Sequence, residues 1–487
     1  MKKITALILF LIILTACAAT DTKIDKEILP TTETTIEPAV NYISDSLPAK
    51  DLDGYTFRIL TFENALRTFN CGIYVDTMNG GVVNDAVYEK IISVEERFNC
   101  NIVLADATPD QGIDLTLQYN TIKNLVLSGE DAFDICTAHD IRMADLSLEG
   151  FFMNVYDIPY LDFDKPWWPS YTVEAMSVGK QMYLISNMIS YLSLTYTRVM
   201  YFNKNMMNDI GQELPYNDVY NGNWTLDKLY SIVKNVYNDI NGDGKHDEED
   251  LYGYANPGYY YCVPEAFNIE PYKKTADGKV YYDLDIERFS VVIDKLYNVF
   301  FNDGSYNSSN DQTIHKMFTE NRIMFIYGRC SDATNYYTHS DVKYGISPMP
   351  KLDESQAEFY GGCNDRPCAV PVTVKKENLD KIGIIIEAMS AEGYRKVFPA
   401  YFEIALKVRY ADQTEDADMF DIVRKNVILS FNYMYGGNTS PYLTIFTTLF
   451  NISNPSKDLA SWAAKNESVQ VARVELINNI FEELRTK

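Results

Sequence analysis

Short strand-like segments alternate with longer helix-like segments over residues 55–137, and this order constrains the fold more than any other feature of the chain. Strand patterns cover 55–60, 101–104 and 132–137, and helix patterns cover 84–98 and 115–127. The order strand, helix, strand, helix, strand predicts a parallel α/β sheet with helices on its faces.

Ligands of such sheets bind beyond the carboxyl ends of the strands, where the next helices begin. Asp140 and Arg142 follow the third predicted strand at that position, beside His139. Asp140 also fits the N-cap of a helix. The position therefore favours a ligand contact and a capping role about equally.

A second α/β region follows a segment rich in proline and tryptophan, 158–169. Three prolines exclude a helix interior there, and we interpret Trp167 and Trp168 as packing residues of an ordered loop. Further strands are predicted at 192–202, 324–328, 343–349 and 368–374, with helices after Trp224 and over 289–301 and a mainly helical region from residue 378.

Length and charge limit the function. The chain has 487 residues, enough for two or three domains, and its formal net charge of −25 argues against a nucleic-acid partner. The sequence contains no G-x-S-x-G, P-loop or H-E-x-x-H motif, and its 4 histidines are far apart. A hydrolase that uses two carboxylates remains open.

The N-terminus resembles a bacterial lipoprotein signal. Lys2 and Lys3 precede an apolar run, and Cys17 follows Leu-Thr-Ala, as in a lipobox. We expect residues 1–16 to be a signal peptide and the Cys17 thiol to be diacylated; the alternative is a plain signal peptide. Residues 17–50 then form a lipid-anchored disordered tether, although a disordered pro-segment would look the same.

The other cysteines carry little functional information. Seven remain besides Cys17, an odd number, and no C-x-x-C motif is present. Cys363 and Cys368 could form a disulfide in an exported protein, and buried thiols are expected for most of the others.

A twelve-residue acidic loop, 239–250, predicts a calcium site. It fits the pattern D-x-[DN]-x-[DN]-G with an acid at position 12, where alternate oxygens surround one hard cation. A solvated acidic turn is the alternative. The expected metal ligands are Asp239, Asn241, Asp243, Lys245 and Asp250. A single loop indicates one structural Ca²⁺ rather than a sensor pair.

The order of several loose motifs resembles the extracellular solute-binding lipoproteins of bacterial ABC importers, in a branch common in Clostridia-like bacteria. The resemblance covers essentially 51–487. After the lipobox, tether and first strand, its segments are 94–99, 131–135, 166–168, 223–229, the calcium-like loop, 344–351 and 399–407.

The resemblance implies an α/β, two-lobed type II periplasmic-binding-protein fold with an interdomain hinge and C-terminal helices. The chain would cross between lobes near 191–197, 326–328 and 371. Lobe one is expected to comprise 51–192 plus 327–372, and lobe two 193–326 plus 373–487.

Similarity to maltose-binding-like proteins implies that both lobes grip a sugar through planar polar groups and aromatic rings. Matching segment order gives these expected ligand-binding residues: Asp140, Arg142, Asn256, Tyr259, Tyr260, Arg329, Ser331, Tyr433 and Tyr435.

The function implied is that of a non-enzymatic monomeric receptor on the outer face of the cytoplasmic membrane. It would deliver a solute, a carbohydrate or oligosaccharide, to the membrane subunits of an ABC importer. The alternatives are a secreted carboxylate-dependent hydrolase, a peptide-binding receptor and a receptor that feeds a sensor kinase.

Overall fold

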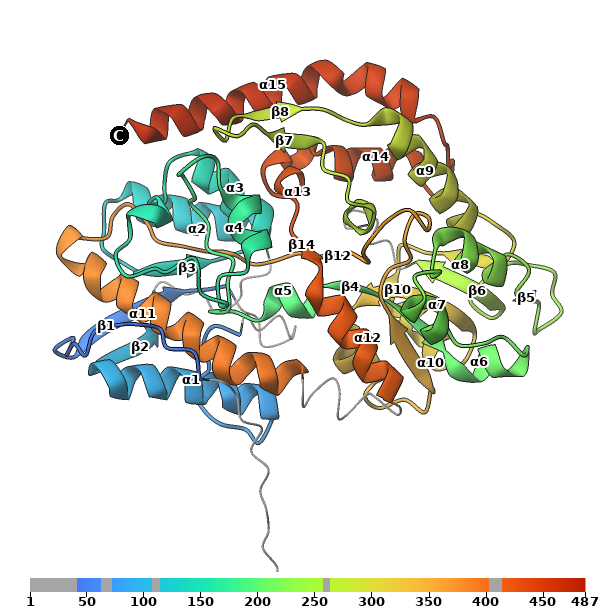
Figure 1. The fold of residues 1–487 in the computed structure, drawn as a ribbon, viewed down its shortest axis with the longest axis horizontal. Coiled ribbons are helices and arrows are strands. Elements are labelled where there is room, and N and C mark those ends of the chain that lie inside the picture. Colours follow the sequence, from blue (N-terminus) through green and yellow to red (C-terminus); the bar gives the residue numbers. More distant parts are fainter. Residues whose placement is uncertain (1–41, 63–71, 107–113, 257–262, 403–413, 487) are drawn as a thin grey trace, which may run out of the picture. The chain divides into compact units, whose positions relative to one another are not determined.

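The computed structural model describes residues 42–62, 72–106, 114–256, 263–402 and 414–486. All elements below belong to residues 43–487, which contacts hold together as one unit (Figure 1). In these ranges no helix is both long and apolar enough to cross a bilayer.

The first sheet confirms the predicted parallel α/β arrangement. Its order is β13-β3-β1-β2, with β1 parallel to β2 and β3, and β13 antiparallel to β3. The strands are β1 (Tyr55–Leu60), β2 (Cys100–Leu104), β3 (Ile135–Thr137) and β13 (Cys368–Ala369). The predicted strand at 368–374 is thus only two residues long, since Pro371 cannot donate to a ladder.

Helices cover this sheet as the apolar periodicity predicted. The helices connecting its first three strands are α1 (Val82–Phe98) and α2 (Leu115–Leu127), and β3 leads into α3 (Asp140–Leu148). In α1 the residues buried on one face include Val87, Ile91 and Val94. A later helix, α11 (Leu379–Glu392), packs against α1 and β1 (Figure 1).

The second sheet has the order β11-β4-β10-β6-β5, with β9 beside β6. Its interior strand β4 is buried at every residue, as expected for a strand covered on both faces. The strands are β4 (Arg198–Asn203), β5 (Tyr237–Asn238), β6 (Leu251–Asn256), β9 (Ser305–Asn307), β10 (Ile323–Arg329) and β11 (Tyr344–Ser347). The predicted strands at 324–328 and 343–349 are confirmed.

The predicted strand at 192–202 is wrong in its first half. Residues Leu192–Thr195 form the short helix α5, and β4 begins only at Arg198. The hydroxyl of Thr195 donates to the carbonyl of Leu192. Such local hydroxyl-to-backbone bonds compete with strand ladders.

The remaining elements lie around both sheets, and the C-terminal region is mainly helical, as predicted. They include α4 (Ser170–Met176), α6 (Lys204–Asp209), α7 (Tyr216–Tyr220), α8 (Leu226–Val233), β7 (Tyr272–Lys274), β8 (Val280–Tyr282), α9 (Ile286–Phe300), α10 (Asp311–Thr319), β12 (Gly361–Gly362), α12 (Thr414–Lys425), β14 (Val427–Ile428), α13 (Phe431–Gly436), α14 (Pro441–Leu449) and α15 (Leu459–Arg485). Helix α15 packs on α9 and β8, whereas α13 packs on α3 (Figure 1).

The lobe boundaries stay a prediction, and two elements bear on them. Strand β11 lies within 327–372 but pairs with β4 in the second sheet. Helix α11 lies within 373–487 but covers the first sheet. The second and third crossings between the sheets therefore come later in the chain than the predicted ones near 326–328 and 371.

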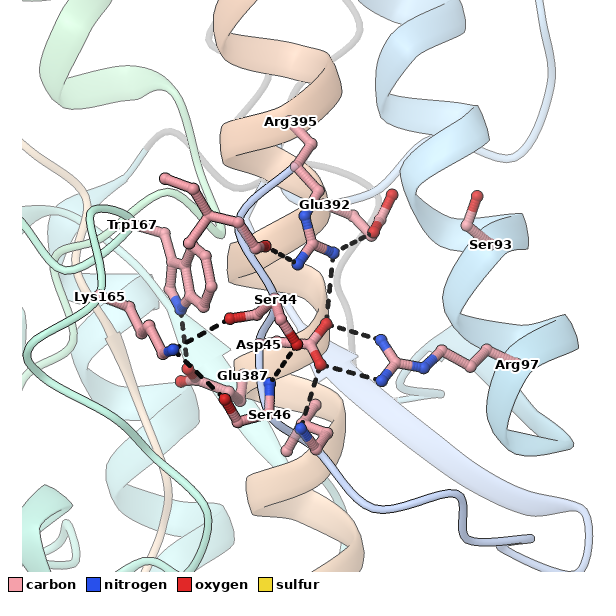
Figure 2. A network of polar contacts seen from close by, with 12 residues as sticks. Ser44, Asp45, Ser46, Ser93, Arg97, Lys165, Trp167, Glu387, Glu392 and Arg395 are labelled. Carbon is pink, nitrogen blue, oxygen red and sulfur yellow. Dashed lines mark hydrogen bonds and ion pairs between the residues drawn. The ribbon is translucent and has the colours of Figure 1, made fainter. Parts of the chain in front are cut away.

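The tryptophans of the proline-rich loop have the packing role that was predicted. Trp167 and Trp168 are 0% and 3% exposed. Both indole N–H groups donate to the buried carboxylate of Glu387, each at 2.8 Å. Figure 2 shows Trp167 over Glu387, beside the segment that carries Ser44 and Asp45. One carboxylate therefore fixes the loop to α11.

Cys363 and Cys368, which the sequence left open as a possible disulfide, do not form one and are both buried thiols. Cys368 belongs to β13, where its backbone pairs with Thr137. Cys100, Cys136 and Cys330 are also buried thiols, as expected. Cys17, Cys71 and Cys262 lie outside the described residues.

Candidate functional site

A polar cavity of about 170 Å³ lies where segments of both sheets meet. On the side of the first sheet, the lining residues follow β3 or precede β13. On the side of the second sheet, Tyr196 precedes β4 and Arg329 ends β10, and Tyr433 comes from α13. The lining residues are His139, Asp140, Tyr196, Arg329, Asn364, Asp365, Arg366 and Tyr433.

Asp140, the first residue of α3, is held as an anion in this wall. Its carboxylate lies 2.7 Å from His139 Nδ1 and accepts a hydrogen bond from Asn364 Nδ2 at 3.4 Å. Burial acts to raise the pKa of Asp140, but His139, the N–H of Ile141 and the charge of Arg366 outweigh it, and the pKa is lowered.

Asp365 experiences the opposite shift. Burial, with a smaller contribution from the charge of Asp140, raises the pKa of Asp365 to about 6. The carboxylate accepts hydrogen bonds from the hydroxyl of Ser186 and from the backbone N–H of Arg366, which limit the shift. The cavity therefore has one firmly ionised carboxylate and one that titrates near neutral pH.

Two arginines occupy the end of the second sheet. Arg198 in β4 and Arg329 in β10 are directly opposite each other in the antiparallel register. The Arg329 guanidinium lies 5.8 Å from the centre of the Tyr196 ring. Arg198 is buried and donates to Asn364 Oδ1 at 2.5 Å, so it holds the amide that in turn donates to Asp140.

The structure brings three of the predicted ligand residues together in this cavity, namely Asp140, Arg329 and Tyr433. Arg142 instead pairs with Asp145 at 3.3 Å on α3. It does not line the cavity.

Three other predicted ligand residues are buried in the protein interior. Tyr435 is fully buried between Phe431 and Phe481. Ser331 is buried, and its backbone N–H donates to the carbonyl of Thr195. Asn256 ends β6 and is fully buried. None of these three lines the cavity.

Tyr259 and Tyr260 lie outside the described residues, so their expected role stays a prediction.

Sequence reasoning missed four lining residues: Tyr196, Asn364, Asp365 and Arg366. For three of them the sequence offered a signal. Asn364, Asp365 and Arg366 form a run of polar residues that follows a pair of glycines and precedes the predicted strand at 368–374. In the fold this run bridges β12 and β13, which belong to different sheets.

The acidic loop at 239–250 turns around its first residue. The carboxylate of Asp239 accepts the backbone N–H groups of Gly242 and Gly244, at 2.6 and 2.9 Å. Asp250 is buried and accepts the hydroxyl of Tyr237 at 3.0 Å.

Two further contacts bear on an ion in this loop. Lys245 Nζ lies 2.6 Å from Asp243 Oδ2, and the Lys245 carbonyl accepts from Tyr237. Within the described ranges, no three His, Cys, Asp or Glu side chains are arranged as a metal centre. The calcium site therefore stays a prediction.

Chemically, the cavity offers hydrogen-bond acceptors and donors side by side. Carboxylates accept hydrogen bonds, guanidinium and amide groups donate them, and the rings of Tyr196 and Tyr433 supply flat apolar faces with polar edges. Such a wall suits a small solute rich in hydroxyl groups.

No protein-family model matches the chain, and no curated protein matches its sequence significantly. Solved structures do match. A cyclo/maltodextrin-binding protein complexed with maltotetraose has a TM-score of 0.51 at 13% identity, covering 90% of this chain and 99% of that chain.

A family 1 extracellular solute-binding protein from Bifidobacterium longum subsp. infantis has a TM-score of 0.51 at 11% identity, covering 88% of this chain and 99% of that one. An ABC substrate-binding protein from Listeria monocytogenes, in complex with cycloalternan, has a TM-score of 0.50 at 12% identity, with 89% and 99% covered. At these identities the likeness concerns the fold alone: this chain shares the α/β fold of these solute-binding proteins.

Proposed function

We propose that this protein is a non-enzymatic extracellular receptor that binds a carbohydrate or oligosaccharide and delivers it to the membrane subunits of an ABC importer. The observation that carries the proposal is the position of the polar cavity. It lies where segments from both sheets meet, in a fold shared over 88–90% of the chain with solute-binding proteins.

The size of the cavity refines the proposal. Its volume of about 170 Å³ is smaller than the ~300–1,000 Å³ of sites that enclose a drug-sized ligand. The cavity would therefore hold one small polar unit, and the rest of an oligosaccharide would extend beyond it. Asp140 would accept hydrogen bonds from its hydroxyl groups, and Arg329 would donate to its oxygens.

The test begins with the ligand. Native mass spectrometry of the full chain from its source cells should detect a co-purified solute of unchanged mass. Calorimetry then compares neutral oligosaccharides (maltotetraose, cellotetraose and xylotetraose) with a mixed peptide library. Sugar heat supports the proposal, whereas peptide heat without sugar heat would make the protein a peptide receptor.

Variants connect binding to the cavity. Asp140→Asn and Arg329→Ala should each weaken sugar binding by roughly 5–150-fold, the loss of about 1–3 kcal/mol expected when a central contact is truncated. Arg142→Ala and Tyr435→Phe provide controls, because neither residue lines the cavity. Equal losses in all four variants would contradict the assignment of this site.

A hydrolase is the second candidate, and one observation favours it. The pKa of Asp140 is lowered while that of Asp365 is raised to about 6. Opposed shifts in neighbouring carboxylates are found in general acid and base pairs. Chromatography of the sugars after long incubation decides between the two, since an importer receptor returns them intact.

We also propose the membrane anchor and the metal ion. Cys17 would carry the lipid that holds a monomer on the outer face of the cytoplasmic membrane. Cys17→Ala should release the protein or leave it uncleaved, as membrane fractionation would show. Asp239, Asn241, Asp243, Asp250 and the carbonyl of Lys245 would bind one Ca²⁺.

A further inference from the structure

We propose that Asp332 is a positioning residue for solute binding: it holds the guanidinium of Arg329 in the wall of the cavity. This inference rests on the proposed function, because it assigns to Arg329 a contact with the solute. It adds a residue that does not itself line the cavity.

The contact between the two residues is made at two points. Asp332 Oδ2 accepts the backbone N–H of Arg329 at 2.7 Å, and Oδ1 accepts its Nε–H at 3.2 Å. Asp332 is fully buried, and the Arg329 side chain is 12% exposed. One carboxylate thus fixes both the backbone and the side chain of a cavity residue.

The chain makes room for this carboxylate at Gly328. A Cβ atom at position 328 would lie 2.8 Å from Asp332 Oδ2 and 3.1 Å from the ring of Tyr201. Any larger residue would displace the carboxylate from Arg329. The end of β10 therefore leaves room for the Asp332 carboxylate beside Arg329.

The orientation of Arg329 matters because an arginine side chain has many rotamers. Ordering such a side chain when a ligand binds has an entropic cost, which a preformed contact removes. With its Nε–H bound to Asp332, the guanidinium stays above the ring of Tyr196 at 5.8 Å. The cavity wall is thus preorganised before the solute arrives.

The opposite side of Asp332 faces a histidine. His315 Nε2 lies 3.8 Å from Asp332 Oδ2, its Nδ1 is 2.8 Å from the hydroxyl of Tyr337, and its ring stacks on Tyr336 at 3.8 Å. Burial lowers the pKa of His315, although Asp332 opposes this, so the imidazole is neutral at neutral pH. The negative charge of Asp332 is then balanced by Arg329.

A double-mutant cycle tests the role of Asp332. Each sugar of the panel that the wild type binds is titrated into Asp332→Asn, Arg329→Ala and the double variant. Asp332→Asn should weaken binding at least tenfold, and adding it to Arg329→Ala should change affinity less than twofold. A loss of the same size in both backgrounds would overturn the proposal, because a purely structural role does not need Arg329.

Asp45→Asn is the matched control. Asp45 is a buried carboxylate with two arginine partners, Arg97 and Arg395, and it does not line the cavity (Figure 2). The substitution Asp45→Asn should lower the melting temperature and leave sugar affinity unchanged. A matching loss of affinity in this control would show that destabilisation alone explains the effect of Asp332→Asn.

A second measurement needs no sugar. In protein labelled with ¹⁵N at arginine Nε, hydrogen exchange of the Arg329 Nε–H is followed by NMR, with Arg329→Lys assigning the signal. The wild type should protect this proton, and Asp332→Asn should remove the protection. Unchanged protection would overturn the proposal. If no panel sugar binds, the proposed function fails, and this measurement alone decides the role of Asp332.

Discussion

Asp45 and Arg97 form an ion pair with two contacts, at 2.6 and 2.9 Å, which fastens the start of the described chain to α1. Arg395 reaches the same carboxylate at 3.2 Å (Figure 2). Asp45→Ala should therefore destabilise the protein by about 1–3 kcal/mol in urea unfolding, because it leaves two arginines without this partner. Asp380→Asn is the control, since its pair with Lys50 is exposed and should contribute under ~1 kcal/mol.

The same pair predicts an acid transition. Burial acts to raise the pKa of Asp45, but Arg97, the N–H of Leu47 and Arg395 outweigh it, and the pKa is lowered. A carboxyl whose pKa is lower in the folded state contributes stability above its unfolded pKa of 3.8, and this is lost as pH falls through the folded value. The difference between wild type and Asp45→Ala should shrink below pH ~4.

Glu387 predicts the opposite dependence on pH. Burial raises its pKa to about 7, although the indoles of Trp168 and Trp167 oppose the shift. Its contribution is full below the unfolded pKa of 4.5 and is lost as pH rises through about 7. Relative to Glu387→Gln, the wild type should lose roughly 3 kcal/mol between pH 4.5 and 8. Asp365 titrates in the same pH range, but it is present in both the wild type and Glu387→Gln, so its effect cancels in the comparison. Curves of unfolding free energy against pH that run parallel for the two proteins would contradict the prediction.

Local patterns in the sequence predicted the elements that depend on local interactions. The helix over 84–98 has an apolar face that needs no knowledge of distant residues, and α1 forms at 82–98. Strand β13 has only two residues and depends on pairing with β3. Its residue Cys368 pairs with Thr137, which lies 231 residues earlier in the chain. The lining run 364–366 depends on the same long-range pairing, so its polar composition alone did not show that it would line the cavity.

Helix geometry explains why two of the predicted ligand residues, Arg142 and Tyr435, do not line the cavity. Residues two apart on a helix point about 200° away from each other, since one turn takes 3.6 residues. Asp140 and Arg142 share α3, and only Asp140 lines the cavity. Tyr433 and Tyr435 share α13, and only Tyr433 does. The prediction named both members of each pair, although the helix allows one.

Calcium should raise the melting temperature of the full chain, and a chelator should lower it. An ion that binds only the folded state at one hundred times its Kd stabilises it by about 2.7 kcal/mol. Asp239→Asn with Asp243→Asn should remove the response. Lys245→Ala is the control, because it keeps the backbone carbonyl and removes an ammonium 2.6 Å from Asp243. It should retain the response, and a melting temperature indifferent to calcium would refute the site.

Replacing Glu265 with glutamine should stabilise the protein. The residue is 1% exposed, and neither carboxylate oxygen has a hydrogen-bond partner among the described residues. Burial raises its pKa well above the usual range and the charge of Glu270 adds to the shift, although its own backbone N–H and the charge of Arg198 oppose it. Above its unfolded pKa of 4.5 the folded state is therefore penalised, increasingly as pH rises. Glu265→Gln removes that penalty and should stabilise the protein at pH 8 by about 1–3 kcal/mol.

Glu270, five residues later, is the matched control because it has partners. Its carboxylate accepts the backbone N–H of Tyr272 at 2.9 Å, the hydroxyl of Ser430 at 2.7 Å and the N–H of Asn432 at 3.4 Å. Burial raises the pKa of Glu270 as well, so the two residues differ chiefly in hydrogen bonding. Glu270→Gln also removes a buried charge, but it replaces an accepting oxygen with an amide NH2 group among N–H and O–H donors. It should therefore stabilise the protein clearly less than Glu265→Gln in urea unfolding at pH 8. Destabilisation by both would show that Glu265 is held by a contact comparable to those of Glu270.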